Sequence, residues 1–158
     1  MSRPTHRKQI VIATDGSAGA AVAAEEGVWL AKKLDADVCF VAVARAPRAL
    51  LGDPYYQRAI TAELARARAA IDAVAPFADE RGVRYEQEIV CGKPSEEILR
   101  VAREREAELI VVGSRGRGAV TGLLGSVSTA VVHGADRPVL VARPSAGRPR
   151  PVRLRAVV

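Results

Sequence analysis

Five glycines lie within thirteen residues, directly after the apolar segment 109–112, and this spacing is suited to binding an anion. They are Gly113, Gly116, Gly118, Gly122 and Gly125. Glycine lets backbone N–H groups approach a phosphate closely, and a helix beginning near Gly125 would add free N–H donors and partial positive charge. Arg115 and Arg117 supply cationic side chains. The segment therefore predicts a phosphate-binding loop, and the alternative is that its glycines only make turns.

The loop resembles one known family. G-S-R-G at 113–116, G-S at 125–126 and D-R-P-V-L-V at 136–141 resemble the C-terminal half of a universal stress protein. The ATP-binding branch of that family carries Gly-x-x-Gly, nine residues and then Gly-Ser/Thr, whereas eight residues, 117–124, fill the gap here. The loop is not a Walker motif, because no Gly-Lys-Ser/Thr follows. The resemblance extends over roughly residues 8–143.

Asp15 is the second candidate, since it follows the apolar segment 9–13 and opens a polar turn. Its carboxylate could accept hydrogen bonds from a ribose hydroxyl or a base amine, or it could cap local backbone N–H groups. Position alone leaves both roles open. The resemblance favours binding, because an Asp at this place contacts the adenosine portion in universal stress proteins, and it assigns a backbone group at Val43 to the adenine edge.

The resemblance thus implies one nucleotide site formed by two separate parts of the chain. The residues assigned to it are Ala13, Asp15, Val43, Val112, Gly113, Ser114, Arg115, Gly116, Arg117, Gly118, Gly125, Ser126 and Val127.

Hydrophobic patterning predicts five strands alternating with four helices. The strands span 9–13, 37–44, 82–90, 109–112 and 139–143, and the longer helices span 18–34, 55–80 and 125–134. Ser17 and Ser95 are predicted N-caps, the latter for a helix that packs Ile98 inward. Pro76 should end or kink the helix over 55–80, and the charged stripe of that helix is interpreted as a solvated face.

This alternation predicts an α/β fold, an open five-stranded parallel sheet with helices on both faces. Three apolar strands and a half-exposed third strand fit the order 3-2-1-4-5, a choice also guided by the family, whose fold is adenine nucleotide alpha hydrolase-like. Ligands bind such sheets outside the carboxyl ends of the strands where the order switches, here between the first and fourth. Asp15 and Gly113 follow these two strands, so both candidates should meet in one crevice.

Composition excludes several classes of protein. No apolar run approaches 18 residues, and residues 1–8 lack a secretory signal, so we expect a cytoplasmic protein. The two cysteines have neither metal-ligand nor C-x-x-C spacing, so we expect buried thiols. The net charge is +6, but much of it lies near the ends, and aromatic residues make up only 4%. We interpret this positive charge as a property of basic termini rather than of a nucleic-acid-binding face.

The leading hypothesis is therefore an ATP-binding stress protein, with Mg²⁺ accompanying the phosphates. The preference could instead be for AMP or a cyclic nucleotide. No catalytic constellation is recognisable, so binding with at most slow hydrolysis is expected. Two alternatives remain. The first is an adenylylating enzyme, although segment 14–17 does not match the Ser-Gly-Gly-x-Asp-Ser loop of such enzymes. The second is a dimeric interaction protein of the same family that binds no nucleotide.

The sequence also predicts domain limits and assembly. Residues 1–8 should be a flexible N-terminus, 9–143 a single domain and 144–158 a basic tail rich in proline and arginine. Strand 139–142 would be a sheet edge without charged residues, which favours a homodimer through antiparallel pairing of this strand with its copy. The alternative is that the tail covers this edge.

Overall fold

The computed structural model describes residues 7–47, 52–115 and 124–144. The elements, in chain order, are β1 (Gln9–Ala13), α1 (Ala18–Leu34), β2 (Asp37–Ala44), α2 (Tyr55–Arg81), β3 (Tyr85–Cys91), α3 (Pro94–Glu104), β4 (Leu109–Gly113), α4 (Ser126–Gly134) and β5 (Val139–Ala142). The expected tail, 144–158, lies outside these residues except for Pro144.

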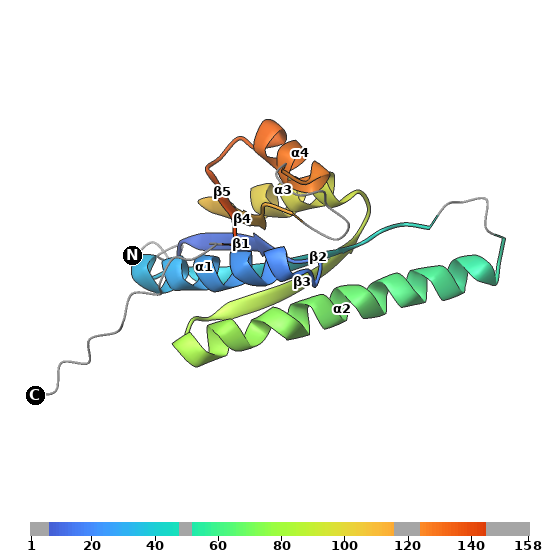
Figure 1. The fold of residues 1–158 in the computed structure, drawn as a ribbon, viewed down its shortest axis with the longest axis horizontal. Helices are drawn as coiled ribbons and strands as arrows, with labels where there is room; N and C mark the ends of the chain where they lie inside the picture. Colours follow the sequence, from blue (N-terminus) through green and yellow to red (C-terminus); the bar gives the residue numbers. More distant parts are fainter. Residues whose placement is uncertain (1–6, 48–51, 116–123, 145–158) are drawn as a thin grey trace, which may run out of the picture.

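The five strands form one parallel sheet in the order β3-β2-β1-β4-β5, which confirms the predicted fold class (Figure 1). The central strand, β1, pairs with β2 on one side and β4 on the other. The chain therefore adds β2 and β3 on one side of β1 and later adds β4 and β5 on the other side. The switch point lies between β1 and β4, as the sequence predicted.

Alternate residues of each inner strand point to opposite faces of the sheet. Ile10 and Ile12 belong to the core beneath α1 and α2, whereas Val11 belongs to the core beneath α3 and α4. Figure 1 shows the two helix pairs on opposite sides of the sheet. Both faces are thus covered, which is why the inner strands read as continuous apolar runs rather than alternating ones.

Helix α1 begins as predicted, because the Ser17 hydroxyl accepts a hydrogen bond from the backbone N–H of Ala20 at 3.2 Å. Small residues on its inner face bring its backbone close to the sheet. At Gly27 a Cβ atom would lie 2.6 Å from Cδ1 of Ile12. This close packing fixes the N-terminus of α1 against the carboxyl edge of the sheet.

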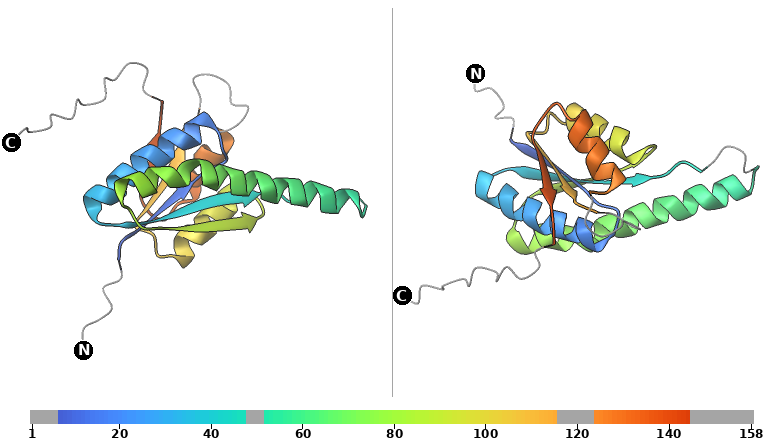
Figure 2. Two further views of the ribbon diagram at one scale, coloured as in Figure 1. Left: turned by 90° about the horizontal axis from the view of Figure 1, so that it is seen from below. Right: turned by 45° about the horizontal axis from the view of Figure 1, so that its top comes forward.

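Helix α2 corrects two expectations. It runs unbroken past Pro76 to Arg81, because its C-terminal half is packed on the sheet through buried residues such as Val74 and Ala78. Tertiary packing there outweighs the lost backbone hydrogen bond. The N-terminal half extends beyond the sheet, as Figure 2 shows, and Leu64, which helical spacing puts on one apolar stripe with Ala67 and Ile71 and which was therefore expected to pack inward, is 40% exposed.

Other corrections concern element ends. Lys93 rather than Ser95 is the N-cap of α3, since Pro94 takes the first helical position, where its fixed φ is favourable and no N–H is needed. Strand β3 begins at Tyr85, because Gly82, at φ 60°, caps α2 and the N–H of Val83 still donates to Ala78 O of that helix. Of the two thiols, Cys39 is buried but Cys91, at the end of β3, is exposed.

Asp37 joins three segments at the amino edge of the sheet. Its carboxylate accepts hydrogen bonds from Arg7 at 2.9 Å and from Arg84 at 3.0 and 3.2 Å. Burial by itself raises the pKa of Asp37, but the two guanidinium groups outweigh it and hold the pKa below its ordinary value. The ionised carboxylate therefore stabilises the fold.

We predict that this stabilisation depends on pH. Because the folded-state pKa is lowered, the stabilisation is complete above the unfolded-state value of about 3.9 and is lost as pH falls through the folded-state value. Asp37→Asn should lower the free energy of unfolding by about 1 kcal/mol at pH 7 and by progressively less below pH 4. Urea titrations of both proteins measure this. Asp35→Asn, at a more exposed partner of Arg7, should change little, and a loss at Asp37 that is independent of pH would contradict the explanation.

Candidate functional site

A cavity of about 620 Å³ opens at the carboxyl edge of the sheet, where β1 and β4 diverge. It brings together residues from both parts of the chain that the sequence singled out. The predicted site residues that line it are Ala13, Asp15, Val43, Val112, Gly113, Arg115, Gly125, Ser126 and Val127. The volume is in the range of a nucleotide-sized ligand site.

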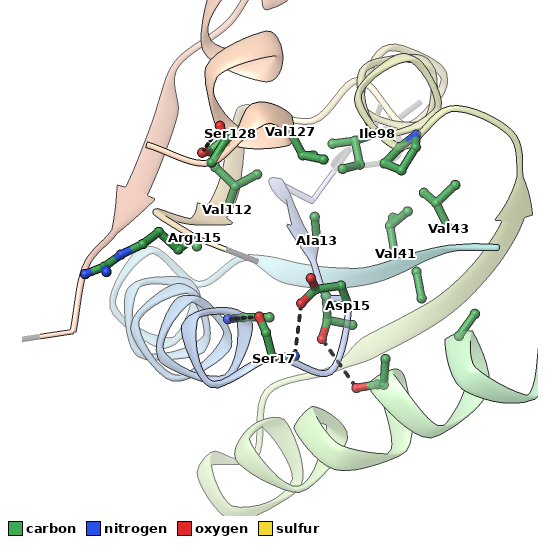
Figure 3. Close-up of a pocket in the computed structure, with 18 of the residues that line it drawn as sticks. Ala13, Asp15, Ser17, Val41, Val43, Ile98, Val112, Arg115, Val127 and Ser128 are labelled. Atoms are coloured by element: carbon green, nitrogen blue, oxygen red, sulfur yellow. Dashed lines mark hydrogen bonds between the residues drawn. The ribbon is translucent and has the colours of Figure 1, made fainter. Parts of the chain in front are cut away.

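Asp15 lies two residues after the last residue of β1 and lines the cavity (Figure 3). Its Oδ1 accepts a hydrogen bond from the backbone N–H of Ser17 at 3.0 Å. The turn between them needs Gly16, which has φ 79°, a conformation unfavourable for other residues. The capping role is therefore present in the structure, and it holds the carboxylate at the edge of the cavity.

Thr14 fixes this turn from the other side. Its side chain is buried, and its hydroxyl donates to the carbonyl oxygen of Ala70 in α2 at 3.4 Å. The backbone N–H of Thr14 also donates to Val41 O at 2.9 Å. Because both neighbours belong to packed elements, the end of β1 is held rigidly between β2 and α2.

The N-terminus of α4 forms the opposite side of the cavity. Gly125 is its N-cap and has no side-chain oxygen to satisfy the first N–H groups. The N–H of Thr129 bonds to Gly125 O at 2.9 Å, while those of Ser126, Val127 and Ser128 have no hydrogen-bond partner within the described part of the chain. Such a helix end attracts anions through free donors and the helix dipole.

Ser114 differs from the other predicted residues because it does not line the cavity. It is buried, its N–H donates to Ala142 O at 2.8 Å, and its carbonyl oxygen accepts from Gly125 N at 2.7 Å and from Ser128 Oγ at 3.2 Å. Ser114 therefore ties the end of β4 to both β5 and the start of α4. In the structure it positions the site rather than facing it.

Two glycines permit close packing beside the cavity. A Cβ atom on Gly113 would lie 2.7 Å from the carbonyl carbon and oxygen of Gly19, and one on Gly19 would overlap the carbonyl oxygen of Arg115. Gly113 thus has a packing role, which differs from the turn-making role that the sequence analysis gave as the alternative to phosphate binding. Gly116, Arg117 and Gly118 lie outside the described residues.

The side chain of Arg115 lies at the margin of the cavity. Figure 3 shows it extending toward β5, away from Asp15. The cation expected to face the phosphates is therefore directed outward in this structure. The anion-binding character of this side comes mainly from the α4 N-terminus.

The other side of the cavity is apolar. Figure 3 shows Val41 and Val43 from β2 facing Ile98 of α3 and Val127 of α4. An apolar slot of this kind suits a flat heterocycle, whose edge can meet the backbone at the end of β2. The site is thus apolar at one end and rich in N–H donors at the other.

Helix α2 contributes residues that the sequence analysis missed. Glu63, Arg66, Ala67 and Ala70 line the cavity, although the charged positions of α2 had been interpreted as a solvated face. Glu63 accepts hydrogen bonds from the Arg66 guanidinium and from the backbone N–H of Arg45 at 3.3 Å. No sequence signal distinguishes these residues, because their role depends on where α2 crosses the sheet edge.

Two further observations concern metals and membranes. Within residues 7–47, 52–115 and 124–144, no three His, Cys, Asp or Glu side chains gather in a group that could hold a metal ion. Among the same residues, no helix is both long enough and apolar enough to cross a membrane.

Residues 6–143 match the model of the Universal stress protein family. A universal stress protein of Methanocaldococcus jannaschii is 34% identical over 139 residues, which cover 86% of this chain and 82% of the relative. A universal stress protein of Thermus aquaticus is 37% identical over 139 residues, covering 86% of this chain and 98% of the relative.

Solved structures share the fold. The universal stress protein UspA of Lactobacillus plantarum is 28% identical, with a TM-score of 0.77 over 87% of this chain and 98% of its own. Two more distant structures hold nucleotides. A universal stress protein in complex with cAMP has a TM-score of 0.69 at 23% identity, covering 89% of this chain and 100% of its own. A universal stress protein from Archaeoglobus fulgidus in complex with dAMP has a TM-score of 0.68 at 21% identity, covering 85% of this chain and 97% of its own.

Proposed function

Because this chain belongs to the universal stress protein family, whose model matches residues 6–143, we propose that its cavity binds an adenine nucleotide, preferentially ATP. The observation that carries the proposal is the convergence of Asp15, an apolar slot and an uncapped helix N-terminus around one cavity of about 620 Å³. We propose a regulatory binding protein with at most slow ATP hydrolysis.

In this proposal the two ends of the ligand contact chemically different walls. The adenine would lie in the slot between Val43 and Ile98, and the ribose would lie beside Asp15. The phosphates would accept hydrogen bonds from the backbone N–H groups at the start of α4, beginning at Ser126. Mg²⁺ would bind through the phosphate oxygens rather than through a cluster of protein carboxylates.

The structures in complex with cAMP and dAMP support the class of ligand but not the choice of ATP. Both hold an adenine nucleotide on the same fold. The residues that line the cavity here supply an apolar slot and free N–H groups, which such a ligand requires. The preferred number of phosphates is therefore determined by comparing the affinities for different adenine nucleotides.

The proposal is tested by mass spectrometry of any ligand released from the purified protein, followed by calorimetric titration with ATP, AMP and cAMP. We expect an adenine nucleotide to be released and ATP to bind most tightly. No binding of any of the three would favour the nucleotide-free interaction protein. Rapid release of pyrophosphate with a second substrate would favour the adenylylating enzyme instead.

We predict that Asp15→Ala weakens ATP binding by at least tenfold, which is about 1.4 kcal/mol. The change removes the carboxylate proposed to accept a hydrogen bond from the adenosine end. It also removes the acceptor of the Ser17 N–H, so a loss of about 1 kcal/mol in the free energy of unfolding is expected as well. Calorimetry and urea titration separate the two effects. Lower stability with unchanged affinity would leave Asp15 only its capping role.

We also propose a homodimer formed through β5, which is an edge strand of the sheet. Its four residues, Val139–Ala142, include no charged side chain, and the first three are only half-buried. An apolar edge with unpaired backbone groups favours pairing with another chain. A two-fold axis beside β5 would let the strand pair with its own copy.

Val141→Lys should weaken this dimer by at least tenfold, because it places two ammonium groups near the proposed two-fold axis. Sedimentation or light scattering at micromolar concentration measures the change. Val90→Lys is the matched control, since Val90 is also half-buried and packs on the same core but lies in β3, at the other edge. Equal weakening by both substitutions, or a monomeric parent protein, would contradict the proposed interface.

A further inference from the structure

A second, shallower cavity of about 540 Å³ adjoins the nucleotide cavity, between the N-termini of α3 and α4. Arg45, Pro94, Ser126 and Val127 line both cavities, so the two are continuous. Lys93 and Ser95 line only the second. None of the residues that the sequence analysis assigned to the nucleotide, apart from Ser126 and Val127, lines this second cavity.

Ser95 is the unusual feature of the second cavity. The residue is only 7% exposed, and within the described part of the chain its hydroxyl has no hydrogen-bond partner. Among the described residues, the fully buried side-chain atoms that lack a partner are Gln9 Oε1 and Arg81 Nε, so the Ser95 hydroxyl is open to the cavity rather than enclosed by protein. Because Ser95 lines the cavity, a bound ligand could provide the missing partner.

The backbone around the cavity favours an anion in that position. The N–H of Glu97 bonds to Lys93 O at 3.0 Å, whereas the N–H groups of Ser95 and Glu96 have no partner among the described residues. Lys93, the N-cap of α3, makes no side-chain cap bond. The N-terminus of α4, with Ser126, meets the same cavity. Two helix N-termini therefore supply free donors and partial positive charge from two directions.

The charged side chains that line the cavity are both cationic, namely Arg45 and Lys93. Lys93 forms an ion pair with Glu96 at 2.7 Å, but both side chains are about two-thirds exposed, so the pairing is weak and exchangeable. Glu96 and Glu97 follow in the first turn of α3, yet neither lines the cavity, and Glu97 is paired with Arg100. The cavity itself therefore presents cations and donors.

We infer that the second cavity is an oxyanion subsite that accepts a phosphate-class group next to the nucleotide. The Ser95 hydroxyl and the N–H groups at the start of α3 would donate hydrogen bonds to its oxygens, and Lys93 would balance its charge. The group has two sources, a phosphoryl group of the nucleotide in the main cavity or free inorganic phosphate. Only the first source rests on the function proposed above.

The test compares Ser95→Asp with Ser95→Asn, two side chains of nearly equal shape that differ by one negative charge. Asp in the first turn of a helix is favourable, so the fold should be retained, and urea titration checks this. Calorimetry at constant ionic strength uses adenosine, ATP and inorganic phosphate. Ser95→Asp should weaken the binding of ATP, phosphate or both at least tenfold relative to Ser95→Asn, and change adenosine binding less than threefold.

The pattern of losses identifies the source of the anion. A loss for ATP alone assigns the subsite to a phosphoryl group of the bound nucleotide, whereas a loss for inorganic phosphate with ATP unchanged assigns it to free phosphate. If wild-type protein binds phosphate but neither adenosine nor ATP, the proposed function fails, while a loss of phosphate binding in Ser95→Asp still supports the subsite.

Other outcomes overturn the inference. These are equal affinities of Ser95→Asp and Ser95→Asn for ATP and phosphate, an equal loss for adenosine, or no binding of ATP or phosphate by the wild-type protein. Arg103→Ala controls for net charge, because it lowers the net charge of α3 by one, as Ser95→Asp does, but at the exposed, opposite end of the helix. A loss in this control as large as that in Ser95→Asp would equally overturn the inference.

Discussion

Gly19→Ala should lower the free energy of unfolding by about 3 kcal/mol or more, although the same change in an ordinary helix stabilises it by about 1 kcal/mol. The reason is the contact between α1 and the segment after β4. A Cβ atom on Gly19 would overlap the carbonyl oxygen of Arg115 and approach its carbonyl carbon to 3.4 Å. Both atoms are backbone, so no change of rotamer can relieve the overlap.

The overlap can be relieved only if α1 and β4 move apart, and both elements border the cavity in which we propose that the nucleotide binds. Gly113→Ala should have a similar effect, because its Cβ atom would lie 2.7 Å from the carbonyl group of Gly19. We therefore expect ATP binding by any folded Gly19→Ala protein to be weakened as well. Urea titration gives the stability and calorimetry the affinity.

Gly52→Ala is the matched control for this prediction. Chain neighbours aside, no atom of the described residues lies within 4 Å of the place its Cβ would occupy, so the free energy of unfolding should change by less than about 0.5 kcal/mol. A rise in stability in Gly19→Ala, as helix propensity alone requires, would show that the close approach of α1 to Arg115 is absent in solution.

The second large effect is expected at Ser126, the first residue of α4. Ser126→Asp should weaken ATP binding about 100-fold, which is about 2.7 kcal/mol. The new carboxylate would occupy the helix N-terminus where the phosphates are proposed to bind, and it would compete for the same N–H donors and repel the anion. Calorimetric titration with ATP measures the loss.

Two comparisons make this result specific. Ser126→Asn has nearly the same shape without the charge, so its affinity for ATP should stay within about fivefold of the parent. Adenosine lacks phosphates, and its affinity should be unchanged in both variants. Because Ser126 is exposed and Asp is favourable in a first helical turn, stability should be retained. Equal affinities of the Asp and Asn variants for ATP would show that the phosphates do not bind at the N-terminus of α4.

The sequence was sufficient for most of the sheet because the strands have strong local signals. Residues 10–13 and 38–44 are continuously apolar, as strands covered on both faces must be, and the predicted strands 9–13 and 37–44 match β1 and β2 residue for residue. Ser17 was recognised as an N-cap because a hydroxyl in that position satisfies the helix N–H groups locally. Such features depend on a few neighbouring residues, so the sequence can specify them.

Element ends were less accurate where tertiary contacts compete with local preference. Pro76 disfavours a helix locally, but burial of Val74 and Ala78 against the sheet keeps α2 continuous to Arg81. The Cys91 thiol was expected to be buried, yet it is exposed because β3 lies at the sheet edge and ends there.

The sequence by itself thus determined the five strands, the start of α1 and the two segments, after β1 and after β4, that form the candidate site. Only the tertiary structure decided how each residue is used. Ser114 turns inward to tie β4 to β5 and α4, and Gly113 makes room for the backbone of α1. Glu63 reaches the cavity because α2 crosses the sheet edge there. These roles arise from contacts between residues far apart in the chain, and local residue patterns carry no information about such contacts.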